Sequence, residues 1–96
     1  MIPFSQLDKT LHEKGRLGIM TLLSSRNSWA FQDLKSELDL SDGNLITHLR
    51  TLEKAGHVKS KKHPVRRETT YAITPAGKKS FTAYLEILEQ IIQATR

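Results

Sequence analysis

Apolar residues in the first quarter of the chain recur at the spacing of helices. Leu7 and Leu11 lie four positions apart, which predicts a short first helix, and we expect Gly15 to interrupt it. Residues 17–23 hold five apolar side chains in seven positions and predict a buried helix. The polar stretch 24–28 marks the end of this helix.

The next stretch predicts a short strand followed by a helix. Residues 29–31, Trp-Ala-Phe, favour a strand that leads into a helix of about eight residues. Phe31, Leu34 and Leu38 lie on one face of that helix because their spacing is i, i+3 and i+7. Residues 39–40 then predict a tight turn.

Another helix follows this turn, over about residues 42–55. Ser41 is placed as its N-cap, since a serine hydroxyl accepts a hydrogen bond from the amide three residues on, here that of Asn44. Gly56 is placed to end the helix, because glycine adopts positive φ at low cost. The apolar stripe of the helix consists of Leu45, Leu49 and Leu52.

Beyond residue 57 the pattern changes from helical to alternating. Two short strands are predicted at 58–61 and 69–73, joined by a polar loop. Thr74 then caps a last helix, with Pro75 at its first position, where the missing N–H of proline costs nothing. We expect this helix to run to about residue 94.

The order of these elements predicts the fold class. Two helices joined by a short turn and followed by a hairpin make a winged helix-turn-helix. We therefore expect a mainly α fold with a small β-wing (α+β), a single domain over residues 1–96, and a C-terminal dimerisation helix at about 75–94.

The positive charge is concentrated in one part of the chain. The net charge is +5. Residues 43–68 carry seven Lys and Arg against two Glu, whereas the stretches before and after them carry −1 and +1. A local basic patch of this kind is typical of a protein that binds a polyanion.

These elements and residues resemble the stand-alone winged-helix transcription regulators of MarR and ArsR type. The resemblance implies a DNA-binding regulator, usually dimeric, with its third helix in the major groove and its wing against the backbone or minor groove. Ile46 departs from the pattern, since ArsR-like regulators often carry serine there. The matching positions are Arg16-Leu17, Ile19, Leu22-Leu23, Phe31, Leu34, the run from Leu40 to Leu45, His48-Leu49, Leu52-Glu53, Ala55-Gly56, Tyr71, Ile73-Thr74 and Ala76-Gly77.

The outward face of the helix at 42–55 carries the candidate base contacts. Asn44 can pair with adenine, Thr47 can touch a thymine methyl group or a phosphate, and Arg50 can reach guanine or a phosphate. Asn44 is also a residue common in helix caps, so a purely structural role stays open. Asp42 favours the helix dipole or accepts from a cytosine amine, and we favour the structural role. The candidate residues on this helix are Asp42, Gly43, Asn44, Ile46, Thr47 and Arg50.

The predicted wing, at about 59–68, carries the second set of candidate DNA contacts. Arg66 or Arg67 at its tip can enter a narrow minor groove. His63 can bind phosphate or respond to pH, and a solvated loop without function is the alternative for the whole wing. The candidates here are Lys59, Lys61, Lys62, His63, Arg66 and Arg67.

The last helix has more apolar surface than one core requires. Its apolar residues form two lines, one of Phe81, Leu85, Leu88 and Ile92, the other of Tyr84, Ile87 and Ile91, across an arc of roughly 160°. We expect one line to cover the core of the domain and the other to contact the same helix of a second chain. The first helix is expected to take part in this contact between chains. The predicted dimer interface comprises Leu7, Leu11, Phe81, Tyr84, Ile87, Leu88, Ile91 and Ile92.

Several kinds of function are not supported by the sequence. The chain has no cysteine, and His12, His48, His57 and His63 lack the spacing of a metal site. It shows no nucleophile–base pair, phosphate-binding glycine loop or paired carboxylates, so we expect neither an enzyme nor a cofactor. It has no apolar run of membrane-spanning length and no signal peptide at its start, so we expect a cytoplasmic protein. Trp29 is expected in the core.

The function predicted from these features is sequence-specific binding of double-stranded DNA by a homodimeric transcription regulator. The alternative is a winged-helix module that binds other proteins within a larger assembly, because fold alone does not fix function. The basic wing favours DNA. The sequence names neither an operator nor a small-molecule effector.

Overall fold

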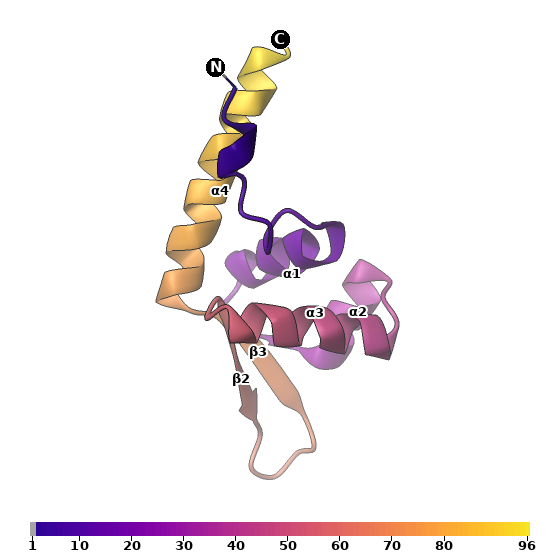
Figure 1. Cartoon of the computed structure of the whole chain (residues 1–96). Coiled ribbons are helices and arrows are strands. Elements are labelled where there is room, and N and C mark those ends of the chain that lie inside the picture. The colour runs from indigo at the N-terminus through magenta and orange to yellow at the C-terminus, as the bar shows by residue number, and fades with distance from the viewer. Residues whose placement is uncertain (1) are drawn as a thin grey trace.

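The computed structural model describes residues 2–96, which form four α-helices, a 3₁₀ helix and a three-stranded sheet. The first three α-helices pack as a body, from which the wing projects on one side and the last helix on the other (Figure 1). This arrangement is a winged-helix fold, as predicted. In chain order the elements are η1 (Phe4–Gln6), α1 (Lys14–Ser25), β1 (Trp29–Ala30), α2 (Phe31–Leu38), α3 (Asp42–Lys54), β2 (Val58–Lys62), β3 (Thr69–Ile73) and α4 (Pro75–Ala94).

The core lies where α1, α2 and α3 meet the inner end of the sheet. Each helix contributes the apolar stripe that its spacing predicts, and the stripe of α3 is at most 1% exposed. Trp29 is buried as expected, and Arg26 stacks over its ring at 3.5 Å from the centroid. The buried core residues are Leu11, Ile19, Met20, Leu23, Trp29, Leu34, Leu45, Leu49, Leu52, Val58, Ile73, Phe81 and Tyr84.

The ends of α3 form as the sequence predicts. The hydroxyl of Ser41 accepts a hydrogen bond from the amide of Asn44 at 3.2 Å, which satisfies one free N–H of the first turn. The turn before α3 is made by Asp39, whose φ of 51° lies in the left-handed region that a short polar side chain tolerates. After the helix, Gly56 adopts a φ of 83°, as expected for a glycine at a helix end.

The wing is an antiparallel hairpin of β2 and β3. The strand order is β1-β3-β2, and the register pairs Val58 with Ile73 at the body and Lys62 with Thr69 near the tip. The amide of His63 donates to the carbonyl of Glu68 at 2.9 Å and closes the ladder. The predicted strands are confirmed, with β2 one residue longer than expected.

Helix α4 is fixed to the turn between α3 and β2. The hydroxyl of Thr74 caps the helix by accepting from the amide of Gly77, and it donates to the carbonyl of Gly56 at 2.6 Å. The amide of Thr74 donates to the carbonyl of His57. Gly77 packs against that same carbonyl so closely that any Cβ would collide with it. These contacts fix the direction in which α4 extends from the body. The N-terminal segment lies alongside α4 (Figure 1).

The prediction of a short helix around Leu7 and Leu11 is wrong. The segment contains only the 3₁₀ turn of η1, and a carboxylate oxygen of Asp8 accepts from the amides of Thr10 and Leu11. This side chain offers the backbone a local turn in place of a helix. Gly15 does not interrupt a helix either, since it lies in the first turn of α1.

The division of the α4 apolar residues into two lines is also corrected. Phe81 and Tyr84 are buried within the chain, and Leu88 packs against the same core. Leu85 and Ile92, grouped on one line with Phe81 and Leu88, are 45% and 40% exposed, so this line is only partly buried. Leu11, predicted at the interface with Phe81 and Tyr84, is fully buried. These three side chains belong to the core of one chain because the N-terminal segment covers the centre of the apolar arc, where Tyr84 bonds to His12.

Candidate nucleic-acid interface

Helix α3 presents most of the predicted base-contacting residues to solvent. Asp42, Gly43, Asn44, Thr47 and Arg50 are exposed, and we refer to these five as the reading face. They are outward because the stripe on the other side of the helix is held in the core.

The polar side chains of the reading face differ in how far they are already engaged. The hydroxyl of Thr47 donates to the carbonyl of Gly43 at 2.9 Å, so its methyl group is the part left for an outside partner. The side chains of Asn44 and Arg50 make no hydrogen bond or ion pair with residues 2–96. Asp42 lies 2.9 Å from the ammonium of Lys35 on α2, which supports a structural role for this carboxylate.

Ile46 lies apart from the reading face and is half-buried. It lines an open groove of about 590 Å³ together with Phe31 of α2 and Tyr71 of β3. Burial raises the pKa of the Tyr71 phenol above its ordinary value, so this hydroxyl stays protonated at neutral pH. The groove joins α2, α3 and the wing into one continuous surface.

The lysines of the wing alternate between the two faces of β2. Val58 points into the core, so Lys59 and Lys61 lie on the opposite face from Lys62. All three are exposed. Lys59 and Lys61 also line a second open groove, of about 640 Å³, on the wing.

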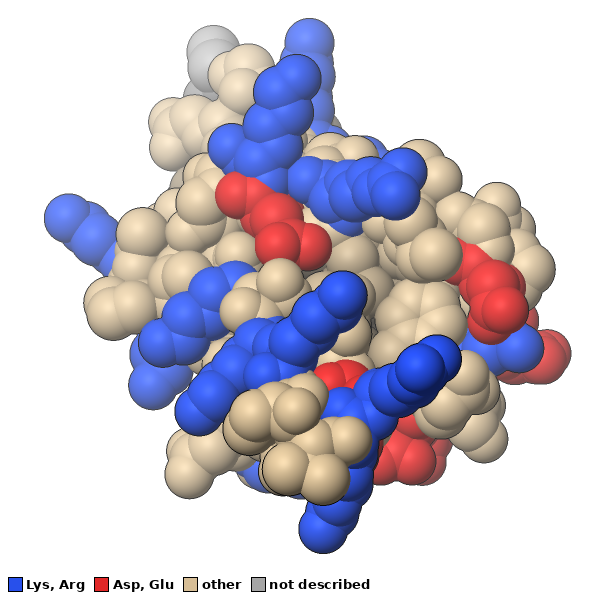
Figure 2. Space-filling view, turned by 90° about the horizontal axis from the view of Figure 1, so that it is seen from below, with Lys and Arg blue, Asp and Glu red and all other residues tan. Residues whose placement is uncertain are grey.

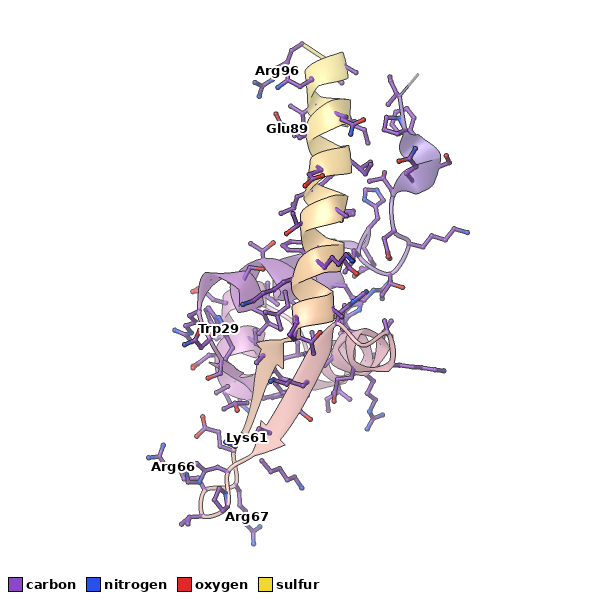
Figure 3. All side chains as sticks on the ribbon, turned by 90° about the vertical axis from the view of Figure 1, so that its left-hand side faces the viewer. Trp29, Lys61, Arg66, Arg67, Glu89 and Arg96 are labelled. Carbon is purple, nitrogen blue, oxygen red and sulfur yellow. The ribbon has the colours of Figure 1, made fainter. Side chains whose placement is uncertain are left out.

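Two arginines occupy the far tip of the wing. Arg66 and Arg67 are both exposed and extend away from the body (Figure 3). Arg66 lies 3.9 Å from the carboxylate of Glu68, a contact that solvent weakens at this exposure. Seen from the wing side, Lys and Arg side chains cover much of the surface, with few acidic side chains between them (Figure 2).

His63 has a structural role that its sequence position did not indicate. Its Nδ1 atom accepts hydrogen bonds from the amides of Val65 and Arg66, at 3.2 and 3.0 Å. This is the geometry by which an Asp or Asn side chain orders a turn. His63 therefore shapes the loop that carries Arg66 and Arg67.

Sequence reasoning missed a polar cluster behind the reading face. The guanidinium of Arg16 on α1 donates to Nδ1 of His48 on α3 at 3.3 Å. Glu13 caps α1 by accepting from the amide of Arg16, and this hydrogen bond is the main reason why the pKa of Glu13 lies below its ordinary value. No sequence signal joins Arg16 and His48, because 32 positions separate them.

Other kinds of site were sought in the same residues. Across residues 2–96, no group of three His, Cys, Asp or Glu side chains is placed to hold a metal ion. No helix in the described part of the chain is long and apolar enough to cross a membrane.

Comparison with known proteins agrees with this geometry. A protein of Methanocaldococcus jannaschii described as uncharacterized is 40% identical over 77 residues, covering 77% of this chain and 84% of its own. A solved transcriptional regulator homologue from Pyrococcus horikoshii is 36% identical, with a TM-score of 0.86 over 90% of this chain and 87% of its own.

More distant solved structures share the fold alone. The regulator AbfR, solved bound to DNA, has a TM-score of 0.77 at 22% identity over 86% of this chain and 64% of its own. Regulators of both the MarR and the ArsR families are among the structures with this fold, so the fold that the resemblance implied is confirmed. The model of a winged helix DNA-binding domain matches residues 16–92. This chain therefore belongs to the family of winged helix DNA-binding domains, whose members are DNA-binding transcription regulators and not enzymes.

Proposed function

We propose that the chain is a sequence-specific transcription regulator that binds double-stranded DNA as a homodimer. The observation that carries the proposal is the exposure of four wing cations that make no ion pair within residues 2–96, beside the exposed reading face of α3. Lysine and arginine placed in this way neutralise phosphates and release their counterions. The four are Lys59, Lys61, Lys62 and Arg67.

In this proposal α3 is the recognition helix and enters the major groove. The groove of B-form DNA admits an α-helix, and its base edges present distinct donors and acceptors. Asn44 pairs with adenine, the methyl group of Thr47 contacts the methyl group of thymine, and Arg50 binds guanine or a phosphate. Ile46 lies at the edge of this contact, where it meets the groove beside Tyr71.

The wing holds the DNA beside the recognition helix. Lys59, Lys61 and Lys62 contact the phosphate backbone, and one of the two tip arginines enters the minor groove. His63 contributes by ordering the tip, since its ring already accepts two amide hydrogen bonds. The DNA-bound structure of AbfR, which shares this fold, supports DNA as the partner.

The dimer is proposed to form through α4. Leu85 and Ile92 expose 45% and 40% of their surface, and Ile87, Leu88 and Ile91 are half-buried beside them. An apolar surface of this kind on a small domain usually marks an interface. A two-fold dimer would present two recognition helices to a near-palindromic site.

Selection of bound duplexes from a random pool tests the proposal. The parent protein should enrich a near-palindrome and bind it at least about 10³ times more tightly than a scrambled duplex. A triple variant with Asn44, Thr47 and Arg50 changed to alanine serves as the control and should enrich nothing. Enrichment of the same sequence by the triple variant would contradict the role of α3. Failure of the parent to bind any duplex at about 0.1 M salt would favour a protein-binding module.

A further inference from the structure

Arg16 of α1 and His48 of α3 meet where these two helices pack together, and His48 lies one turn after Asn44 at the edge of the reading face. His48 directly follows Thr47 in the chain, and its side chain is only 19% exposed. Arg16 is half-buried beside it. Both side chains are partly buried and contact each other, so their contact needs a different explanation from that of the exposed wing cations.

The contact selects one tautomer of the neutral histidine ring. A guanidinium has donors but no acceptor. The Nδ1 atom of His48 therefore accepts from Arg16, and the ring proton of neutral His48 is on Nε2. A carboxylate oxygen of Glu13 lies 3.7 Å from the same Nδ1 atom and accepts from the amide of Arg16. Each of the three residues of this cluster, Glu13, Arg16 and His48, therefore contacts the other two.

Gly15 provides the space in which the ring lies. A Cβ atom at this position would be 2.6 Å from Nε2 of His48 and 2.7 Å from Cδ2. The imidazole thus packs directly on the backbone of α1, in the first turn of the helix, which also contains Arg16. A side chain at residue 15 would require the imidazole of His48 to shift from this position.

The cluster also connects α3, through the N-terminal segment, to α4. The Nε atom of Arg16 donates to the carbonyl of Thr10 at 2.6 Å. Two residues further on, Nδ1 of His12 lies 2.8 Å from the hydroxyl of Tyr84 on α4. One guanidinium therefore joins α1, α3 and the N-terminal segment, and that segment is tied to α4.

We propose that the contact between Arg16 and His48, seated on Gly15, sets the orientation of α3 relative to α4 and so positions the reading face for base contacts. Arg16 and His48 are positioning residues, since they act through the helix. The inference rests on the proposed DNA-binding function. Because base contacts require correct placement and phosphate contacts of the wing do not, loss of the cluster should lower specific binding and spare non-specific binding.

Two glycine substitutions in the same helix test this with a matched control. Gly15→Ala displaces His48, whereas Gly18→Ala displaces Leu38, whose Cδ2 atom would lie 2.7 Å from the new Cβ. Both changes crowd a side chain against α1 to the same degree, but only the first involves the cluster. Each variant is measured for thermal unfolding and for its affinity on the selected duplex and on a scrambled duplex.

Arg16→Lys completes the set and is expected to fold. A lysine keeps the charge but has no planar fork, so it cannot bond to Thr10 and His48 together. Gly15→Ala and Arg16→Lys should lower the ratio of specific to non-specific affinity about tenfold or more, the value of a hydrogen bond to a charged group. Gly18→Ala should keep the parent ratio, whatever it does to the melting temperature.

Three results would overturn the inference. The first is a ratio within twofold of the parent in both Gly15→Ala and Arg16→Lys. The second is an equal fall in Gly18→Ala, which would show that the effect is one of general packing. The third, a parent that does not distinguish the two duplexes, would contradict the proposed function as well.

Discussion

Gly43 stands in the first turn of α3 with no packing reason to be glycine. A Cβ atom built there meets nothing within 4 Å, and the residue is exposed. Glycine in a helix is less favourable than alanine by roughly 0.5–1 kcal/mol. Its presence at the centre of the reading face is explained if another molecule approaches the backbone closely at this point.

Replacing Gly43 by alanine should therefore have opposite effects on the free protein and on its complex. The free energy of unfolding should rise by up to about 0.5–1 kcal/mol, because alanine is the better helix former. The affinity for DNA should fall, since the added methyl group separates the helix from the groove. Thermal unfolding and duplex titration measure the two effects. A more stable variant with unchanged affinity would mean that DNA does not approach Gly43.

Three polar residues of the reading face can be separated from the wing by single substitutions. Changing Asn44, Thr47 or Arg50 to alanine should cost about 1–3 kcal/mol on the preferred site and relax the preference at one base pair. For Thr47 the proposed DNA contact is made by its methyl group, since its hydroxyl bonds to Gly43, so a duplex with uracil in place of thymine should mimic the loss of this contact. An equal loss on preferred and scrambled duplexes would show that these residues contact only the backbone.

At the scale of elements, the wing should supply binding energy without sequence preference. A variant with alanine at Lys61, Lys62, Arg66 and Arg67 should lower the affinity for all duplexes alike. The slope of log affinity against log salt should fall by about 0.9 for each phosphate contact removed. The measurement is a series of titrations at different salt concentrations.

The control for the wing is a variant with the same change in net charge elsewhere. Alanine at Lys9, Lys78, Lys79 and Arg96 removes four cations outside the wing, and Arg96 lies at the opposite end of the molecule (Figure 3). This variant should keep most of the parent slope. Equal slopes for the two variants would show that only the net charge matters and that the wing does not bind DNA.

The cap of α1 makes a prediction about pH. Glu13 accepts from the amide of Arg16, which lowers its pKa against the opposing effect of burial; the guanidinium of Arg16, and His48 whenever it is protonated, act in the same direction. A lowered pKa in the folded state means that the ionised carboxylate stabilises the fold at a pH above its ordinary value of 4.5. This contribution disappears as the pH falls through the lowered value.

Glu13→Gln should therefore destabilise the protein at neutral pH but not in acid. The side chain is 36% exposed, so solvent screening limits the effect. We expect a melting temperature lower by about 2–4 °C, which corresponds to about 0.5 kcal/mol for a domain of this size. Glu37→Gln, at an exposed glutamate that makes no hydrogen bond or ion pair within residues 2–96, is the control. A difference that persists at a pH well below the lowered pKa of Glu13 would contradict the cap as its origin.

Local elements of this fold could be predicted from sequence because their causes are local. The caps at Ser41 and Thr74 depend on residues three positions away, and both are confirmed. The segment around Asp8 was mispredicted for a related reason, since its side chain bonds the amides that a helix would have used. Periodicity registers apolar spacing and does not register such a competitor.

Contacts between distant parts of the chain could not be predicted in this way. The apolar arc of α4 is too wide for its periodicity to show which side meets the core, so each of the two predicted lines mixes environments: Leu85 is exposed on the line of Phe81, and Tyr84 is buried on the line of Ile87. The packing of the N-terminal segment decides that question. The contact between Arg16 and His48 likewise exists only because the fold brings α1 and α3 together.

At the scale of the whole molecule, the wing and the free end of α4 lie at opposite ends of a body 52 Å long (Figure 1). Contacts along α4 between two chains would leave both wings and both copies of α3 free to meet one DNA duplex. The half-sites would then lie about one helical turn, roughly 10 base pairs, apart. The proposed dimer would thus bring the wing, α3 and α4 of two chains together in one DNA-binding assembly.

The exposed residues of α4 give this proposal a direct test. Changing Leu85 and Ile92 to glutamate places two like charges on each copy of the predicted interface, where they would be buried without partners. Light scattering at micromolar concentration should show the parent as a dimer and the variant as a monomer. The variant should also bind a two-half-site duplex more weakly than the parent and lose most of its dependence on half-site spacing, while retaining binding to a single half-site. Ala83 and Gln90, both exposed and also seven residues apart, lie roughly 160° around the same helix at about 100° per residue, so glutamate at these two positions is the matched control. The control should keep the mass and the affinity of the parent. A parent that is monomeric at this concentration, or a Leu85 and Ile92 variant that remains dimeric, would place the contact between chains elsewhere or remove it altogether.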